Sequence, residues 1–546
     1  MSEEAHQRLW DVVVVGTGIG GATAGYALAK AGFSVLFCEK GIRHETQSDT
    51  LRGNWAESFF FADKERRPLV GYLERAGRRS DPIVKLSEHG EVATPMLGQG
   101  SGGSSSLYGM VCERFFPIDF EPIEFASLAP NSTAPQRWPI SFKQLAPYYS
   151  QAERLYRVRS GQDELRPAGE ERVVMAPPPF GTANTELVAH FKSRGLHPYH
   201  LPMACEYVPG CKECIGFLCN RACKGDSAKM CLAPAIEDHG ATILDACTVE
   251  KIETEGTTVS SILCRRGTQK ICIRAKIVIL AAGALETPAL LLRSTSEQWP
   301  EGLANRSGQV GRNLMRHFLD YYIVKMSKPI AEGQLLKQIG FNDLYDSKDC
   351  KLGTVQSNGR LPPVQLLART YLSDLAGRYP MLSVFGQLLE RPIEHYLTRL
   401  LSRSMVFASI LEDYPYAENR VGITAAGAIA VHYEVQAEDQ KRLQIFRRKI
   451  LELMKPYKVV PVFSGEKLRS LGHACGTCRF GNDPATNVLD ANNRAHGLNN
   501  LYVVDASFLP TSSGTNPSLT IAANALRVAE QLILRREPAS PAIHAA

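Results

Sequence analysis

A glycine motif near the N-terminus is the feature that most constrains how this chain can fold. Gly16, Gly18 and Gly21 follow the β-branched run at residues 11–15 and precede the small, apolar residues 22–31. In this spacing the first glycine permits a tight turn, the second lets a pyrophosphate approach the backbone, and the third lets the helix pack on the strand. The motif therefore predicts a dinucleotide-binding βαβ unit.

The second strand of this unit is expected at residues 34–39, and it ends on an acidic residue. Glu39 lies about twenty residues beyond the motif, where a carboxylate can accept hydrogen bonds from ribose hydroxyls and disfavours the 2′-phosphate of NADP. The helix that begins at the motif, with Gly20 in its first turn, directs unpaired N–H groups and a partial positive charge at the phosphates. FAD and NAD both remain open from this motif alone.

Length and composition limit the class of protein. A chain of 546 residues exceeds the roughly 100–200 residues of one compact core, so we expect two large lobes. With 44% hydrophobic and 22% charged residues, the chain is neither disordered nor fibrous. The net charge of +6 comes without a basic run, so no nucleic-acid partner is expected.

The N-terminal residues MSEEAHQRLW lack the basic and apolar regions of a secretory signal. No apolar run approaches the roughly 20 residues that span a bilayer. We therefore expect a cytoplasmic protein without a transmembrane segment, and membrane association through a partner remains open.

Further motifs decide between FAD and NAD. In chain order they are a Gly/Ser-rich loop at residues 98–110, a strand and Ala-Gly turn at 279–292, the segment HACGTCRFG at 473–481, and the segments VVDAS at 503–507 and GTNPSLTI at 514–521. Together with the glycine motif, these ordered segments resemble the signatures of the glucose–methanol–choline (GMC) oxidoreductase family. The resemblance extends over the chain from residue 12 to about residue 534 and implies FAD.

The resemblance also implies which residues contact FAD. The loop ending at Met110 would lie beside the flavin ring, Val249 near the adenine, and Asp505 near the ribityl or pyrophosphate region. Some family members tether FAD through a histidine in or near this loop; serines occupy it here, so the FAD is expected to be non-covalent. The predicted cofactor-binding residues are Gly16, Gly18, Gly20, Gly21, Glu39, Gly102, Gly103, Ser104, Gly109, Met110, Val249, Gly283, Asp505, Ala506, Pro517 and Ser518.

His473 and Asn516 match the catalytic pair of the family. The resemblance thus implies an FAD-dependent enzyme that acts on CH–OH donors, as a dehydrogenase or an oxidase. His473 would take the hydroxyl proton while the flavin takes the hydride, and Asn516 would orient the hydroxyl without competing for the proton. The histidines outside these motifs, His89, His317 and His496 among them, are expected to be structural.

Cysteines crowd into one stretch of the chain. Cys211, Cys214, Cys219 and Cys223 are the predicted metal ligands of this stretch, and Cys205 and Cys231 flank them. Thiolates suit iron–sulfur clusters and structural zinc. The stretch resembles both the cluster-binding segment of some sugar dehydrogenases, which carry a [3Fe–4S] cluster, and a segment of aminoglycoside-biosynthetic alcohol oxidases. A cluster, zinc, disulfides and free thiols all remain open.

The expected fold class is α/β, with a Rossmann-like FAD-binding domain and a discontinuous α+β substrate domain on an antiparallel sheet. FAD-binding segments are expected at residues 1–160, 205–320 and 469–546, the second with the cysteines and the third with His473 and Asn516. Substrate-domain segments are expected at residues 161–204 and 321–468. Within the latter, we expect helices near residues 383–411 and 435–456. The first has an amphipathic pattern through Met405, typical of a membrane-surface helix or of a helix that covers the substrate lobe.

The substrate class follows only by analogy. A sugar, polyol or glycoside is favoured, and a sterol or other apolar alcohol is the alternative. The electron acceptor is expected to be oxygen, a quinone, or a partner subunit or cytochrome. Two other readings are an NAD-dependent dehydrogenase, which leaves the C-terminal motifs unexplained, and an FAD-binding electron-transfer subunit without alcohol chemistry, against which the His473–Asn516 pair argues.

Overall fold

The computed structural model describes most of the chain. The described residues are 8–63, 65, 67–88, 90–122, 129–330, 336–347, 350–378, 386–468 and 471–536. His89 lies outside them.

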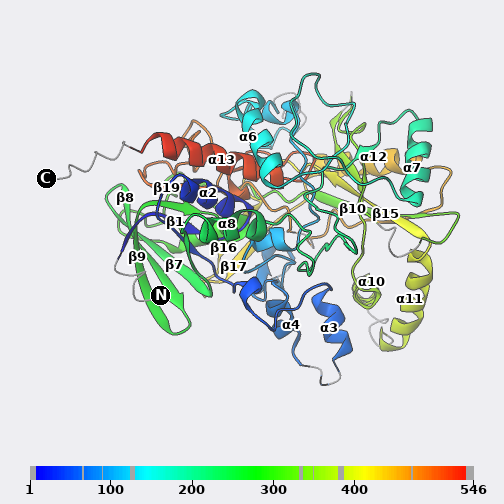
Figure 1. Ribbon diagram of the computed structural model, residues 1–546, viewed down its shortest axis with the longest axis horizontal. Helices are drawn as coiled ribbons and strands as arrows, with labels where there is room; N and C mark the ends of the chain where they lie inside the picture. The colour runs from blue at the N-terminus through cyan, green and yellow to red at the C-terminus, as the bar shows by residue number, and fades with distance from the viewer. Residues whose placement is uncertain are drawn as a thin grey trace.

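A seven-stranded sheet forms around the N-terminal βαβ unit (Figure 1). Its strands are β6 (Thr242–Leu244), β2 (Val35–Cys38), β1 (Leu9–Val15), β9 (Gln269–Leu280), β8 (Thr258–Arg266) and β7 (Cys247–Glu255), with β19 (Leu501–Val503) paired to β9. The pairs around β1 and the β19–β9 pair are parallel, whereas β7, β8 and the first half of β9 form an antiparallel ribbon. The strand β9 thus joins the predicted ribbon to the nucleotide-binding sheet.

Helices built from small residues cover this sheet. Helix α2 (Ile19–Lys30) packs beside α13 (Ser518–Leu534), which also contacts α6 (Phe142–Leu155). A Cβ at Gly25 would lie 2.3 Å from the ring of Phe37, so glycine lets α2 approach β2 closely. The sheet and these helices share one large apolar core. The short α8 (Ala233–Glu237) and α9 (Gly283–Arg293) complete this half of the molecule.

A second, six-stranded sheet is antiparallel throughout and has its own core. Its order is β18 (Val459–Val462), β10 (Phe318–Lys325), β15 (Ser404–Leu411), β14 (Gly353–Ser357), β11 (Ile339–Phe341) and β5 (Tyr199–His200). Residues of α7 (Thr182–Ser193) and α12 (Ala437–Leu453) are buried in that core. This is the antiparallel sheet expected of the substrate lobe.

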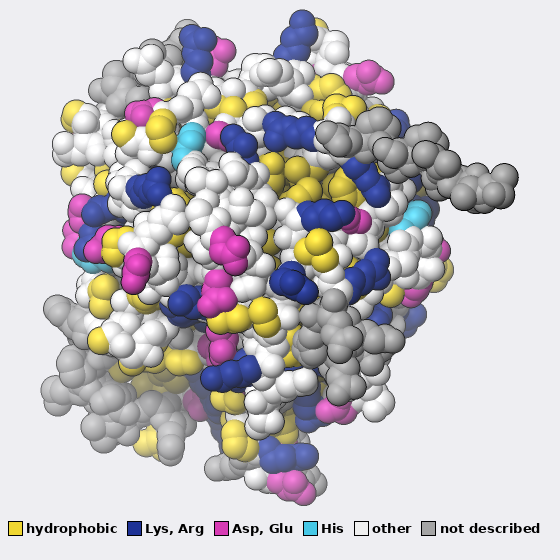
Figure 2. All heavy atoms as spheres, turned by 90° about the vertical axis from the view of Figure 1, so that its left-hand side faces the viewer, with side chains coloured by type: hydrophobic (Ala, Val, Ile, Leu, Met, Phe, Trp, Pro, Cys, Tyr) yellow, Lys and Arg dark blue, Asp and Glu magenta, His cyan; other side chains and the backbone are white. Residues whose placement is uncertain are grey.

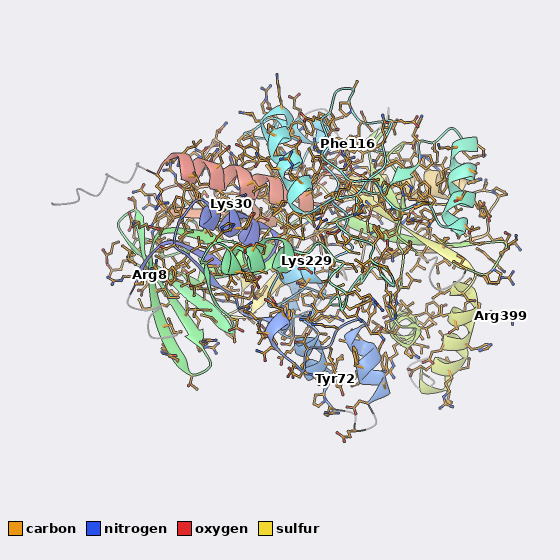
Figure 3. All side chains as sticks on the ribbon, in the orientation of Figure 1. Arg8, Lys30, Tyr72, Phe116, Lys229 and Arg399 are labelled. Atoms are coloured by element: carbon orange, nitrogen blue, oxygen red, sulfur yellow. The ribbon has the colours of Figure 1, made fainter. Side chains whose placement is uncertain are left out.

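Smaller elements lie around the two sheets. A four-stranded sheet has the order β16 (Arg420–Ile423), β17 (Ile429–His432), β3 (Ile83–Lys85) and β4 (Glu91–Ala93), and a two-stranded ribbon pairs β12 (Asp346–Ser347) with β13 (Cys350–Lys351). Helices α3 (Ala56–Ala62) and α4 (Leu69–Arg75), the latter carrying Tyr72, project from the lower side of the molecule (Figures 1 and 3).

The prediction of one long helix near residues 383–411 is wrong for the second half of that range. Helix α11 (Gly386–Leu401) packs on α10 (Val364–Arg378) and ends before Met405, with Arg399 at the molecular periphery (Figure 3). Residues 404–411 instead form β15, in which every residue is buried. An apolar run of eight residues fits a buried strand as well as a helix, and pairing with β10 on one side and β14 on the other decides the outcome.

The mixed α/β fold is confirmed, whereas the division into domain segments stays a prediction. Among the described helices, none is long and apolar enough to cross a membrane. On the face shown in Figure 2, basic and acidic side chains are interspersed over the antiparallel ribbon and its surroundings.

A buried ion network links the two halves. The Lys351 ammonium lies 2.5 Å from an Asp119 carboxylate oxygen and 2.7 Å from a Glu412 oxygen, and all three side chains are almost fully buried. Phe116, labelled in Figure 3, precedes Asp119 and packs on Tyr345, whose hydroxyl donates to the Asp119 carboxylate. The network joins the 117–120 turn to β13 and the end of β15.

We predict that Lys351→Met destabilises the fold strongly, because it leaves two buried carboxylates without their cation. Removing one partner of a buried ion pair costs about 3–5 kcal/mol. The measurement is the melting temperature of the purified variant. The control is Lys455→Met, which removes a solvent-exposed partner of Glu452 and should leave the melting temperature unchanged. Equal melting temperatures for wild type and Lys351→Met would contradict the prediction.

Candidate active site

A cavity of about 620 Å³ runs from the glycine motif to His473 and Asn516. It begins at the C-terminal ends of β1 and β2 and passes the Ala-Gly turn before α9. It ends where α13 begins. Ligands of open parallel sheets bind at the carboxyl ends of the strands, so this position is the expected one.

The glycine motif forms a cradle with one open side. A Cβ at Gly20 would lie 2.1 Å from the Val504 carbonyl oxygen, and one at Gly21 would lie 2.2 Å from the Gly16 carbonyl oxygen. Both glycines are therefore required by packing. At Gly18 the nearest atom is 4.0 Å away, so its backbone faces open space in the cavity. This is the arrangement that allows a pyrophosphate to approach the backbone.

Most predicted cofactor-binding residues line the cavity. Those in contact with it are Gly16, Gly18, Gly20, Glu39, Gly103, Ser104, Gly109, Val249, Gly283, Asp505, Ala506, Pro517 and Ser518. Gly21, Gly102 and Met110 lie behind this lining. Gly21 serves helix packing, and Met110 is fully buried with a left-handed φ of 59°.

The carboxylates of Glu39 and Asp505 accept hydrogen bonds from several segments that form the walls of the cavity. Glu39 accepts hydrogen bonds from the Thr17 amide and hydroxyl and from the Gly41 and Gly100 amides. Asp505 accepts from the Gly283 amide, the Thr287 hydroxyl, and the amide and hydroxyl of Ser507. A ribose hydroxyl at Glu39 would have to replace one of these donors.

His473 lies beside a second histidine that was expected to be structural. Strand-like pairing of Met315 with Cys475, through N···O distances of 3.0 and 2.8 Å, aligns the two segments. As a result the Nδ1 atoms of His317 and His473 lie 3.0 Å apart. His317, expected to be structural, thus contacts the predicted catalytic histidine through a long-range pairing that no local pattern reveals, and its role stays a prediction.

The hydrogen bonds of His317 assign the tautomers of both rings. His317 Nε2 lies 2.9 and 2.8 Å from the carbonyl oxygens of Ser512 and Ser513, which can only accept, so this nitrogen carries the proton. If His317 carries no second proton, its Nδ1 is an acceptor, and His473 donates to it through its own Nδ1–H. His473 Nε2 is left with a free lone pair.

Asn516 approaches that lone pair. Gln356 Nε2 donates to Asn516 Oδ1 over 2.7 Å, which turns the Asn516 amide nitrogen toward His473 Nε2, 3.4 Å away. Gln356 Oε1 is buried without a hydrogen-bond partner among the described residues. Neither His317 nor Gln356 belongs to a sequence motif of the site, although the left-handed φ of His317, 64°, marks it as a constrained position.

Burial keeps His473 neutral. Its pKa lies well below the ordinary value, first because the ring is desolvated and then because Lys337 adds positive charge nearby. A neutral imidazole with a free Nε2 lone pair is the state that a general base requires. The His496 ring, by contrast, lies 3.3 Å from the Gly481 carbonyl oxygen, and a structural role for it stays a prediction.

The cysteine stretch brings three thiols together. Cys205, Cys211 and Cys223 have mutual sulfur distances below 4.8 Å, with 3.6 Å between Cys205 and Cys211 and 3.2 Å between Cys211 and Cys223. Of the other predicted ligands, Cys219 lies 3.5 Å from Cys223 and Cys214 contacts Cys219, but neither belongs to the mutually close set. Cys205, a flanking residue in the sequence, belongs to the close set.

Comparison with known proteins supports this reading of the fold and cavity. Profiles described as GMC oxidoreductase match residues 89–319 and 415–525, and one described as FAD binding domain matches residues 11–53. Paromamine 6'-oxidase of Streptomyces fradiae is 29% identical over 96% of this chain and 91% of its own length. The fructose dehydrogenase large subunit of Gluconobacter japonicus is 23% identical over 96% of this chain and 97% of its own.

A solved structure has the same fold. Pyridoxine 4-oxidase from Mesorbium loti superposes with a TM-score of 0.62 at 20% identity and covers 97% of this chain and 100% of its own. The residues matched by these profiles include the glycine cradle, most of the cavity walls, and His473 and Asn516. The chain is a member of the GMC oxidoreductase family.

Proposed function

We propose that this protein oxidises a CH–OH group of a sugar, polyol or glycoside with non-covalently bound FAD. The observation that carries the proposal is the hydrogen-bond chain that leaves His473 Nε2 with a free lone pair beside the Asn516 amide, at one end of the cavity. The open backbone of Gly18 fits the cofactor's pyrophosphate at the other end. When bound, FAD supplies the hydride acceptor.

The protein's own residues would bind and orient the alcohol and take its proton. The Asn516 amide donates a hydrogen bond to the hydroxyl oxygen, and His473 Nε2 accepts the hydroxyl proton. By accepting from His473 Nδ1–H, His317 holds the His473 ring in the tautomer whose Nε2 lone pair can accept the proton. His317 is thus a positioning residue.

Polar groups near His473 favour a hydroxylated substrate over a sterol. Gln356 Oε1 is a buried acceptor without a hydrogen-bond partner among the described residues, and the Gln356 amide donates to Asn516 beside His473. The compared relatives are named for paromamine and fructose, which agrees with this preference. No histidine lies in the loop of Ser104, Ser105 and Ser106, which supports non-covalent binding of FAD.

We propose further that the cysteine stretch binds a thiolate-held metal centre, a [3Fe–4S] cluster that passes electrons to a partner subunit or cytochrome. Cys205, Cys211 and Cys223 would supply three neighbouring thiolate ligands. Zinc is the alternative, because Zn–S bonds of about 2.3 Å place tetrahedral thiolates about 3.8 Å apart, near the spacing of these sulfurs.

We predict that Gly18→Ala purifies without flavin although the fold is intact. An alanine Cβ there would have no protein atom closer than 4.0 Å and can conflict only with a ligand. The matched control is Gly20→Ala, whose Cβ collides with the Val504 carbonyl and should lower the melting temperature as well as the flavin content. The measurements are flavin absorbance per chain and the melting temperature of flavin-free protein. A fully flavin-loaded Gly18→Ala would contradict the proposed pyrophosphate contact.

We predict that His473→Ala lowers kcat by about 10²–10⁴-fold while the flavin content stays at the wild-type level, because only the proton acceptor is lost. His317→Leu should lower kcat substantially, whereas His317→Gln, which can still donate to the Ser512 carbonyl and accept from His473, should retain most activity.

Since the pKa of His473 is lowered, the wild-type rate should persist as the pH falls through 6.5 and decline only below that. Stopped-flow flavin reduction from pH 5 to 8 measures these effects.

We predict that anaerobically purified protein contains iron and labile sulfide near a 3:4 ratio. Cys223→Ala should lose both while keeping flavin, and Cys272→Ser, at an exposed cysteine outside the stretch, should keep all three. Elemental analysis with sulfide determination is the measurement. One zinc per chain, or no metal, would contradict the cluster.

A further inference from the structure

Among the residues that the structure describes, one buried lysine beside the cavity has no hydrogen-bond or ion-pair partner for its ammonium group. Among the described residues, four lysines are buried: Lys85, Lys224, Lys337 and Lys351. Lys85 and Lys351 form ion pairs, and Lys224 donates to the carbonyl oxygens of Ser106 and Phe217. The Lys337 ammonium has neither a hydrogen bond nor an ion pair in the described part of the chain, although its residue is only 7% exposed.

An unpaired ammonium is costly in such a place. Desolvation lowers the pKa of Lys337 to about 8, with the more distant Glu213 opposing the shift, so at neutral pH the group is still mostly charged. Burying a charge without a partner costs several kcal/mol. Buried cations in folded proteins are paired with protein groups, ordered water or ions, so a lysine without a protein partner is a candidate contact for a bound anion.

The surrounding chain holds Lys337 in position. Its backbone amide donates to the Glu213 carboxylate over 2.6 Å, and the following Gln338 amide donates to the Ser357 hydroxyl over 3.0 Å. The residue leads directly into β11 of the substrate-side sheet. Its position is thus set by the main chain, and only the side-chain nitrogen is left without a partner.

The ammonium lies beside a residue that lines the cavity. Its Nζ is 3.2 Å from where a Cβ of Gly109 would be, and Gly109 lines the cavity together with His473 and Asn516. Its charge also contributes to the electrostatic environment of His473. The cofactor's pyrophosphate would be held at the opposite end, by the glycine cradle, and cannot be the missing anion. The remaining sources of negative charge near His473 are the substrate and the reduced flavin ring, and the second test below separates them.

Resting on the proposed function, we propose that Lys337 forms an anion-binding subsite of the active site and that the substrate is an alcohol bearing a carboxylate, such as a sugar acid. The carboxylate would pair with the Lys337 ammonium while the hydroxyl of the same molecule lies between His473 and Asn516.

The first test is binding without turnover. Acetate and its neutral isostere acetamide are titrated into FAD-loaded enzyme at pH 7 and constant ionic strength, and perturbation of the flavin spectrum reports binding. Wild type should bind acetate at least tenfold more tightly than acetamide. Lys337→Met should lose that preference, and Lys337→Arg should keep it. Equal affinities in wild type, or unchanged acetate binding in Lys337→Met, would overturn the subsite.

The second test uses two polyols that differ in charge, gluconate and sorbitol. The ratio of their kcat/KM values should fall at least tenfold in Lys337→Met, mainly through KM for gluconate. A ratio that does not change, or a variant that alters only the flavin midpoint potential, would assign the charge to the cofactor and overturn the inference. Protein without flavin would instead refute the proposed function, so the two failures are distinguishable.

Discussion

The candidate active site depends on a buried loop, residues 511–516, that two adjacent carboxylates hold in place. Glu412 accepts from the Ser513 amide, and Asp413 accepts from the Ser512 hydroxyl and from the His317 amide. Asp413 therefore fixes the start of β10 and the loop against each other. That alignment places the Ser512 and Ser513 carbonyls on the His317 ring, and through it sets the tautomer of His473. Since Lys351 neutralises Glu412, the ion network is also part of the support of the site.

Two regions with different physical demands meet at this loop. The nucleotide-binding half consists of close backbone contacts, in which glycines and alanines let α2 and α13 lie near the sheet. The substrate-side half is an antiparallel sheet that contributes Gln356 from β14 and Lys337 from the residues before β11. The cofactor end of the cavity is thus formed largely by main chain, and the reaction end by side chains. This division fits a family in which one cofactor serves many alcohols.

The sequence allowed the nucleotide-binding half to be predicted because its signals are local. The valine run, Gly16 to Gly21 and Glu39 lie within one βαβ unit, and each has a physical role that its neighbours determine. His473 and Asn516 were found through motif resemblance. His317, Gln356 and Lys337 were not, because their roles depend on contacts with segments far away in the sequence. The apolar run at residues 404–411 was misassigned because its pattern fits both a helix and a strand buried on both faces.

The pairing of β14 with β15 has a consequence for how this fold can vary. Ser357 faces Phe407 across the ladder, yet residues 358–403, which include α10 and α11, separate the two strands in the sequence. Adjacent antiparallel strands need only a short turn, and the entropy of closing a loop grows slowly with its length. The register of the sheet that carries Gln356 is therefore independent of the size of this excursion. Relatives can lengthen, shorten or exchange it while the geometry around His473 is inherited unchanged.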